Sequence, residues 1–472
     1  MTKRRARVLA TMTSIALVAI AGTDAAGAAP DDTTEDTAVE DTATEESGSA
    51  GGEHGPGTLL GDNGTTGAGW VVDTEDCTDP DAANAPIEGP IKLGVSMPLS
   101  GGPAASAYAP FADGLNAYVT YANEHELVPG HEIQLSVGDD QFNPALAPDV
   151  VNGLLDEGVV AMTGIIGSGS NLAVADLLNE ECVPQLFGQS GLPEWGEDIA
   201  DRPWSFGNLI PYDLESRAYA RQVSELYPDG ATAMTFYVNI EFGEAIASGF
   251  EDAADEYGIE MLGRQTIEAT ETGPPTAQVR EIASQQPDVI MAIPLGAQCP
   301  VFLTELANAK AANPGWEPAV FITNTCASKQ ILGAAGAAAD GVYSSASAGL
   351  RDPDDPEQQD VPEVQNYIAA MEAGGYPEAS ISVGAAGWNV METTVEILRQ
   401  AAESDAGLTR ASIINVTRNL YYHPSMTRDG VEYKMSGEDD GWYVEDVQIV
   451  QYVADSSTFS EVGDLITEFR YS

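Results

Sequence analysis

From residue 91 onward, short apolar runs alternate with longer amphipathic stretches. The apolar runs are predicted strands, and the stretches between them are predicted helices. In the first half the predicted strands are 91–97, 131–137, 159–163 and 183–187, and the predicted helices are 111–123, 144–157 and 171–180. We predict a loop at 98–110, where Gly, Pro and Ser are frequent.

The strand and helix alternation then starts again. The second set of predicted strands is 231–238, 260–267, 289–294 and 319–323, and its predicted helices are 214–227, 243–257, 276–285 and 300–311. Two longer helices at 361–373 and 380–402 and hairpin-like strands at 425–453 follow. Repeated strand–helix–strand units predict parallel sheets, so the fold class is α/β with two doubly wound lobes.

The first 90 residues have a different composition. Basic residues, an apolar run and the small residues Ala26-Gly27-Ala28 predict a signal peptide over 1–28, cleaved near Ala28. An uncleaved anchor is the alternative. Residues 29–90 form an acidic extension that we predict to be disordered, with its second half tied to the folded body through 70–72 and Cys77.

The net charge of the chain excludes some classes of binding partner. The chain has 74 Asp and Glu against 19 Lys and Arg, a formal net charge of −55. Such a chain repels nucleic acid and anionic lipid, so neither is an expected partner. No stretch after the signal peptide is long and apolar enough to predict a membrane span in the mature chain.

The carboxyl ends of the predicted strands indicate where a ligand binds, because ligands of open parallel sheets bind there. In the first half, the loop Gly167-Ser168-Gly169-Ser170 leads from a strand into a helix. Backbone N–H groups and the helix dipole at such a place favour a carboxylate. The alternative interpretation of this loop alone is an ordinary helix N-cap.

Four segments together resemble a known family. They are IKLGVSMPLSGGPA, GDDQFNPALA, TGIIGSGSNLAVADLLNEECVPQL and YVNIEFGEAIASGFEDAADEYG. Their order and spacing over residues 91–455 resemble type I periplasmic binding proteins, including the leucine/isoleucine/valine-binding proteins. The resemblance implies two lobes joined by a multi-crossover hinge. It places 91–208 and 346–420 in lobe 1, and 209–345 and 421–472 in lobe 2.

The family's ligand contacts are transferred to matching positions. Ser168, with the N–H groups of Gly169 and Ser170, matches the carboxylate-binding loop. A second loop contributes Gln189, Ser190 and Gly191, where Gly191 replaces a family Thr. Phe242 replaces a family Tyr, and Tyr108 is a further apolar wall candidate, as is Trp195.

One family feature is missing. Thr325 occupies the position of the acidic residue that pairs with the ligand's ammonium. Burying an ammonium without an anion is unfavourable, so the sequence does not favour an α-amino acid over other small organic molecules. Glu241, Glu194 and Asp140 are candidate substitutes.

Nothing in the sequence favours catalysis or a cofactor. The segment Gly188-Gln189-Ser190-Gly191 lacks the last Gly of a nucleophile elbow, which is Leu192 here. No metal-binding pattern is present. The resemblance therefore implies a monomeric, non-enzymatic solute-binding protein outside the cytoplasm. Its expected partners are a small polar organic ligand, namely a branched-chain amino acid or a related small organic acid or amide, and the permease subunits of an ABC importer. A sensor that acts through a separate membrane protein is the alternative.

Four cysteines in an exported chain predict disulfides, and four cysteines allow three pairings. With the family's lobe arrangement, we predict the pairs Cys299–Cys326 and Cys77–Cys182. The first pair follows two adjacent lobe 2 strands. The second pair joins the N-terminal extension to lobe 1.

Overall fold

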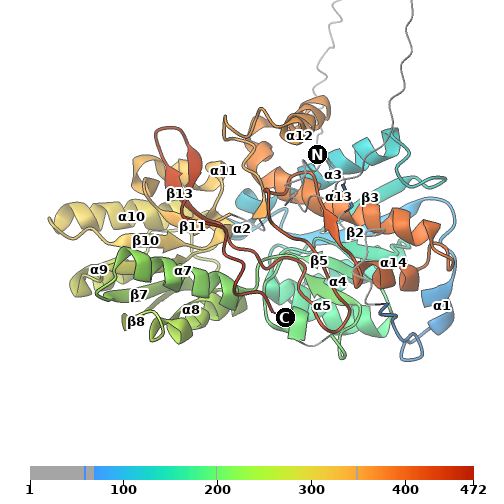
Figure 1. The fold of residues 1–472 in the computed structure, drawn as a ribbon, viewed down its shortest axis with the longest axis horizontal. Helices are drawn as coiled ribbons and strands as arrows, with labels where there is room; N and C mark the ends of the chain where they lie inside the picture. The colour runs from blue at the N-terminus through green and yellow to red at the C-terminus, as the bar shows by residue number, and fades with distance from the viewer. Residues whose placement is uncertain (1–57, 60–68, 198, 347–348, 472) are drawn as a thin grey trace, which may run out of the picture. The chain divides into compact units, whose positions relative to one another are not determined.

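The computed structural model describes residues 58–59, 69–197, 199–346 and 349–471. The predicted signal peptide and most of the predicted disordered extension lie outside these residues. Two parallel-stranded sheets with flanking helices make up the described chain (Figure 1). The predicted α/β class is confirmed.

The first sheet has five parallel strands in the order β3-β2-β4-β5-β6. They are β2 (Ile91–Met97), β3 (Ile133–Asp139), β4 (Ala161–Thr163), β5 (Gln185–Gly188) and β6 (Ser205–Gly207). Its connecting helices are α2 (Gly102–Tyr108), α3 (Pro110–Glu124), α4 (Ala147–Asp156), α5 (Ser168–Glu180) and the short α6 (Glu194–Glu197).

The second sheet has seven strands in the order β14-β13-β11-β10-β9-β7-β8. They are β7 (Ala231–Val238), β8 (Ile259–Ile267), β9 (Val289–Ile293), β10 (Ala319–Ile322), β11 (Tyr343–Ser345), β13 (Ile449–Val453) and β14 (Thr458–Glu461). Strands β7 to β11 are parallel, and the late strands β13 and β14 join antiparallel at one edge. The chain therefore returns to this sheet after leaving it.

Helices accompany each sheet (Figure 1). The second sheet is connected by α7 (Tyr212–Leu226), α8 (Glu241–Ala254), α9 (Thr276–Gln285) and α10 (Gln298–Ala312), followed by the short helices η2 (Asn324–Cys326), α11 (Lys329–Leu332) and η3 (Gly333–Ala339). After β11 come α12 (Pro362–Ala373), η5 (Glu378–Ser380), α13 (Ile381–Glu403), α14 (Arg410–Thr417) and β12 (Tyr422–His423), which pairs with β1 (Thr58–Leu59).

Helices from the late part of the chain pack beside the first sheet. α13 packs along α3, and their backbones approach closely at two glycines. A Cβ on Gly114 would lie 1.8 Å from the carbonyl oxygen of Gly384, so no larger residue fits there. This packing agrees with the predicted return of the chain to lobe 1, but the lobe boundaries themselves stay a prediction.

The central strands of both sheets are buried on two faces, whereas the edge strands β3 and β8 are mostly part-exposed. All five residues of β9 and six of the seven residues of β2 are buried. Strands covered by helices on both sides require such apolar runs, which explains why the sequence pattern located these strands correctly.

Three predictions need correction. The predicted loop at 98–110 contains α2, because Pro103 lies in the first turn of a helix and the alanines that follow favour helix. Apart from β12, residues 421–447 pair only through isolated antiparallel bridges, and the regular hairpin is β13–β14. Strands β6 and β11 and helix α14 were not predicted, because each is eight residues or shorter.

The end of the acidic extension is ordered, so the predicted disorder up to residue 90 is wrong for 69–90. α1 (Pro80–Asn84) lies there. The backbone N–H of Val72 donates to Oδ1 of Asn415 at 2.7 Å, and the N–H of Thr78 donates to the carbonyl of Glu180 at 2.8 Å. The predicted disulfide Cys77–Cys182 is present, with 5.6 Å between its Cα atoms. The second half of the extension is therefore tied to the body, as its sequence indicated.

Candidate ligand-binding site

A cavity of about 160 Å³ lies at the carboxyl ends of strands from both sheets. Loops after β3, β4 and β5 contribute to its wall from the first sheet, and loops after β7, β9 and β10 contribute from the second. Much of the wall is aromatic: Tyr108, Phe111, Phe142, Tyr212, Phe242 and Phe459. The predicted location of the site, at the carboxyl edges of parallel strands, therefore contains a cavity suited to an apolar molecule.

Three hydroxyl groups meet at one part of this wall. Ser168 Oγ lies 2.8 Å from Ser190 Oγ and 3.2 Å from the Tyr212 hydroxyl. Burial raises the pKa of Tyr212 to about 12, so its hydroxyl keeps its proton. We call Ser168, Ser190 and Tyr212 the hydroxyl cluster. The two hydrogen bonds within the cluster use two of its three O–H groups as donors, so one O–H is left to donate to an oxygen atom of a ligand.

The hydroxyl cluster lies at the start of α5. Ser168 is the first residue of that helix, and the N–H groups of a first helical turn have no partner inside the helix. These groups and the helix dipole favour a negative charge.

Tyr212 lies beside the positions of two family residues that this chain lacks. Its ring packs edge-on against Phe242, with 5.6 Å between centroids. Its backbone N–H donates to the carbonyl of Gly191 at 2.8 Å. A Cβ at Gly191 would lie 2.3 Å from the carbonyl oxygen of Ile210, so the family's Thr has no room here.

A buried aspartate shapes the loop that carries Phe142. Asp140 accepts hydrogen bonds from the Phe142 N–H at 2.8 Å and from Ser96 Oγ at 2.9 Å. Phe142 has a positive φ of 56°, which is unusual for an aromatic residue. The carboxylate of Asp140 is thus used to hold this turn and does not line the cavity.

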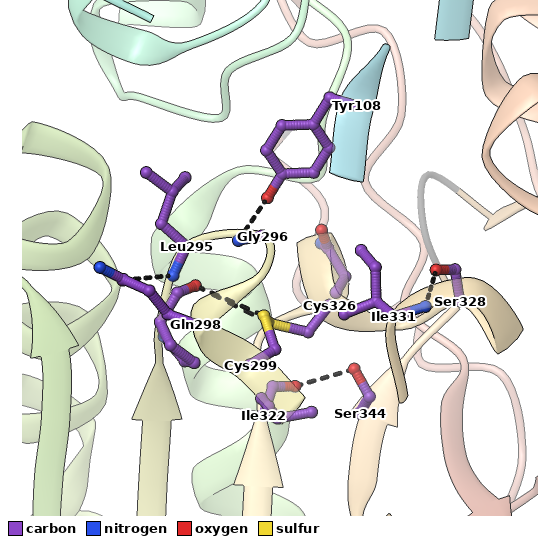
Figure 2. Close-up of a disulfide and its surroundings, with 12 residues drawn as sticks. Tyr108, Leu295, Gly296, Gln298, Cys299, Ile322, Cys326, Ser328, Ile331 and Ser344 are labelled. Carbon is purple, nitrogen blue, oxygen red and sulfur yellow. Dashed lines mark hydrogen bonds between the residues drawn. A yellow bond between two sulfur atoms is a disulfide. The ribbon is translucent and has the colours of Figure 1, made fainter. Parts of the chain in front are cut away.

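A disulfide joins the segments after β9 and β10, two of the three segments that form the second sheet's part of the wall. Cys299 lies in α10 and Cys326 in η2, with 6.1 Å between their Cα atoms (Figure 2). The N–H of Gly296, just before α10, donates to the Tyr108 hydroxyl at 3.2 Å. The predicted pairing Cys299–Cys326 is therefore present, and α2 from the first sheet contacts a loop of the second.

Asn324, at the end of β10, carries polar atoms that remain unused. Its side chain lines the cavity, and the residue is only 2% exposed. None of the described residues gives a hydrogen bond to its Oδ1 or Nδ2. Its backbone N–H donates to Oε1 of Glu215 at 2.9 Å, and burial raises the pKa of Glu215 to about 7.

Three charged side chains also line the cavity. Arg351, Asp352 and Arg428 line it, and among the described residues Asp352 is the only acidic side chain that does so. Both arginines are paired outward, Arg351 with Asp429 at 2.6 Å and Arg428 with Glu461. Burial raises the pKa of Asp352 to about 6.

The structure places the nine predicted ligand-binding residues in two groups. Five line the cavity: Tyr108, Ser168, Gln189, Phe242 and Thr325. Four are behind its surface: Gly169, Ser170, Ser190 and Gly191. Whether any of them binds a ligand stays a prediction. Sequence reasoning missed Tyr212, Asn324 and Asp352, although Asn324 lies in a strand-end loop that the sequence did predict.

Of the three suggested substitute acids, none lines the cavity. Asp140 holds its own loop, and Glu194 and Glu241 lie at the starts of α6 and α8. Trp195, a predicted wall residue, is buried in the core away from the cavity.

Comparison with known proteins identifies the family. The sequence model of the periplasmic binding protein family matches residues 90–457. The chain belongs to that family. This confirms the resemblance seen in the four sequence segments.

A curated relative of this periplasmic binding protein covers only part of it. The relative is a Leu/Ile/Val-binding protein homolog 2 of Brucella abortus, 25% identical over 169 residues. The match spans 36% of this chain and 44% of the relative.

Solved structures match over nearly their whole length. A branched chain amino acid ABC transporter protein from Thermus thermophilus with bound valine has a TM-score of 0.70 at 19% identity, covering 81% of this chain and 97% of its own. A fatty acid ABC transporter substrate-binding protein from Thermomonospora curvata has a TM-score of 0.65 at 19% identity, covering 81% and 95%. An ABC transporter solute binding protein from R. palustris in complex with benzoate has 0.63 at 20% identity, covering 79% and 96%. At these identities the likeness establishes the shared fold.

The described part of this periplasmic binding protein has neither a metal site nor a membrane helix. No group of three or more His, Cys, Asp or Glu side chains is arranged to hold a metal ion in the described ranges. In the same residues, no helix combines the length and apolar character that crossing a bilayer requires.

Proposed function

We propose that this chain is an exported solute-binding protein that captures a small organic carboxylate and delivers it to an ABC importer. The carboxylate binds at the hydroxyl cluster, and the apolar body of the solute packs against the aromatic wall. Ser168 is the main anchor, assisted by the N–H groups of Gly169 and Ser170. Binding and closure of the two lobes are the whole function, with no chemical step.

The observation that carries this proposal is a mainly apolar cavity, with several aromatic side chains in its wall and one cluster of hydroxyl groups at a helix N-terminus. An anion bound there gains charge-assisted hydrogen bonds, which are stronger than neutral ones. The cavity lining is mostly apolar, and Asp352 is the one acidic side chain among the described residues that lines it. Two other carboxylates adjoin the anchor loop without lining the cavity: Asp140 accepts a hydrogen bond from the Ser170 side chain, and Glu241 Oε2 would lie 3.2 Å from a Cβ on Gly169. This combination favours an acidic head with an apolar body.

The solutes named for the similar structures agree with this class. Valine, fatty acids and benzoate are all carboxylic acids. Only valine has an α-ammonium, and Thr325 stands where the family's partner for that group is acidic. A carboxylate without an α-ammonium therefore suits this cavity better than a branched-chain amino acid does.

Contacts between the two sheets support closure around the solute. The N–H of Ala297, in the second sheet's loop, donates to the carbonyl of Pro103 at 3.1 Å, and Gln330 donates to the carbonyl of Ser106 at 3.2 Å. A ligand that contacts both sheets adds to these bonds and shifts the population toward the closed form. The importer's permease subunits then bind the surface that closure creates. We propose that the protein acts as a monomer.

Export agrees with the two disulfides, because disulfides persist in oxidising compartments outside the cytoplasm. A receptor domain that signals through a separate membrane protein remains the second candidate. It shares the capture step and differs only in the partner.

Native mass spectrometry of the secreted protein tests the proposal. We expect one small molecule per chain, released on unfolding and identified as a carboxylic acid. Calorimetry with that acid is expected to give one site per chain. An acid that is consumed in the presence of the protein, or a bound molecule without a carboxyl group, would contradict it.

A further inference from the structure

The side chain of Asn324 is polar, buried and without a partner among the described residues. Both its Oδ1 and its Nδ2 are enclosed, and the residue lines the cavity. Buried amide groups in folded proteins nearly always have hydrogen-bond partners, so such an exception requires an explanation.

The local fold does not use this side chain. Asn324 begins η2, and its backbone N–H and carbonyl are both engaged, with Glu215 Oε1 at 2.9 Å and with the N–H of Ala327 at 2.9 Å. The N-cap of this short helix is Thr323, and Oδ1 and Nδ2 of Asn324 make no hydrogen bond to the helix or to other described residues. The amide is therefore held in place by its backbone and available to another molecule.

Helix α7 places Asn324 near the hydroxyl cluster. Tyr212 contacts Ser168 with its hydroxyl, and Glu215, one turn later on the same face, accepts the N–H of Asn324. Residues three apart on a helix are neighbours. A single small molecule can therefore contact Ser168 and Asn324 at once.

We propose that Asn324 is a second ligand anchor, and that it selects a solute whose far end carries an amide with its N–H and C=O on the same side. A primary carboxamide and a ring lactam both have this arrangement. The inference rests on the proposed function, because Ser168 holds the carboxylate of the same molecule.

The choice of an amide follows from what Asn324 offers. Its side chain presents an acceptor and two donors in one plane, and an amide pairs with Oδ1 and Nδ2 together. An ammonium has only donors, so it would satisfy Oδ1 and leave Nδ2 unpaired. A methyl group would leave both atoms unpaired, as they are without a ligand.

Three matched probes test the inference. They are 4-carbamoylbenzoate, 4-methylbenzoate and 4-(aminomethyl)benzoate, which share an aromatic acid and differ only at the para position. Their dissociation constants are measured by calorimetry on the full secreted protein and on Asn324→Leu and Asn324→Asp. Asn152→Leu, at an exposed position on α4, is the matched control.

The wild type is expected to bind the carbamoyl probe at least about tenfold more tightly than the other two probes. This ratio corresponds to the free energy of one or two buried hydrogen bonds. Asn324→Leu removes this preference, and Asn324→Asp shifts it toward the aminomethyl probe. Asn152→Leu behaves as the wild type. The melting temperature of ligand-free Asn324→Leu stays equal or rises, because no hydrogen bond within the described residues is lost, whereas a structural asparagine would lower it.

The outcomes separate the two proposals. Binding of the probes with a para preference that is the same in wild type and Asn324→Leu overturns the role of Asn324 and leaves the carboxylate anchor standing. A lower melting temperature in ligand-free Asn324→Leu also overturns it. No binding of any probe to the wild type overturns carboxylate capture, and the inference with it.

Discussion

The hydroxyl cluster and Asn324 are two polar parts of one cavity wall with opposite hydrogen-bonding states. Ser168, Ser190 and Tyr212 bond to one another across 2.8 and 3.2 Å, so the cluster is ordered before a ligand arrives. The amide of Asn324 has no such partners among the described residues. In the proposed function the first donates to the carboxylate of the solute, and in the further inference the second gains its hydrogen bonds only when a ligand is present.

The difference shows how one cavity separates affinity from specificity. A pre-ordered cluster loses little entropy on binding, and any carboxylate satisfies it. A ligand with a matching donor and acceptor forms hydrogen bonds with the unpaired buried amide. A ligand without these groups leaves the amide unpaired, which is unfavourable. The following predictions test this division, from the largest expected effect to the smallest.

The two disulfides stabilise different regions of the chain. Replacing Cys77 and Cys182 with Ser opens a loop with a sequence separation of 105, and replacing Cys299 and Cys326 opens one of 27. From loop entropy, the unfolding free energy falls by about 4–5 kcal/mol in the first variant and about 3–4 kcal/mol in the second. Urea denaturation measures both losses.

Only the second disulfide holds a loop of the cavity wall. The Cys299→Ser, Cys326→Ser variant is therefore expected to bind its solute more weakly, while the Cys77→Ser, Cys182→Ser variant keeps its affinity. Equal affinities in the two variants would show that the disulfide does not order the wall around Asn324.

Glu215 makes the region behind Asn324 sensitive to pH. Burial raises its pKa to about 7 from an ordinary 4.5, so between these pH values the folded chain keeps a proton that the unfolded chain loses. The contribution of Glu215 to the unfolding free energy therefore falls as pH rises from about 4.5 to 7. Glu215→Gln removes this fall, which amounts to at most about 3 kcal/mol.

Denaturation at pH 5 and pH 8 measures this effect. The wild type is expected to lose more stability between the two than Glu215→Gln does. The matched variant Glu281→Gln, at an exposed position on α9, keeps the wild-type dependence. Parallel pH profiles for wild type and Glu215→Gln would exclude the predicted role of this carboxyl group.

Ser168→Ala removes the central hydroxyl of the cluster. A hydrogen bond to a charged group contributes about 1.5–3 kcal/mol, so affinity for the carboxylate is expected to fall about tenfold to a hundredfold. The melting temperature of the ligand-free protein should change little. Ser284→Ala, at an exposed position on α9, is the control, and an unchanged affinity in Ser168→Ala would exclude the anchor.

Tyr212→Phe should have the smallest effect, because the Tyr212 hydroxyl supports Ser168 at 3.2 Å and the ring is kept. The loss of one neutral hydrogen bond is about 0.5–1.5 kcal/mol, or roughly twofold to tenfold in affinity. Calorimetry compares it with Tyr121→Phe on α3, away from the cavity. A larger loss than that of Ser168→Ala would show that Tyr212, and not Ser168, is the main anchor.

The sequence pattern predicted the fold well where strands are covered on both faces. β2, β7 and β9 are continuous apolar runs. Short runs of this kind are typical of strands that are covered on both faces. The pattern failed at α2, where Gly and Pro suggested a loop, and at residues 69–90. There the order depends on a disulfide and on hydrogen bonds that the N–H groups of Trp70 and Val72 donate to Asn419 and Asn415, over 340 residues away in sequence.

The candidate site was predicted in part for a similar reason. Loops at the carboxyl ends of strands are visible in the sequence, so Ser168 and Gln189 were found. Tyr212 and Asp352 reach the cavity from a helix and from a segment after β11, through packing that no local pattern encodes. Asn324 follows β10, and an asparagine after a strand is equally typical of an ordinary turn, so the sequence does not reveal that its side chain is buried and unpaired.

The most direct test of solute capture is to identify what the secreted protein holds and to measure its binding to wild type and Ser168→Ala. The account predicts one carboxylic acid per chain, bound at a single site and about tenfold to a hundredfold more weakly by the variant. A bound molecule without a carboxyl group, or a carboxylic acid bound equally well by Ser168→Ala, would contradict it.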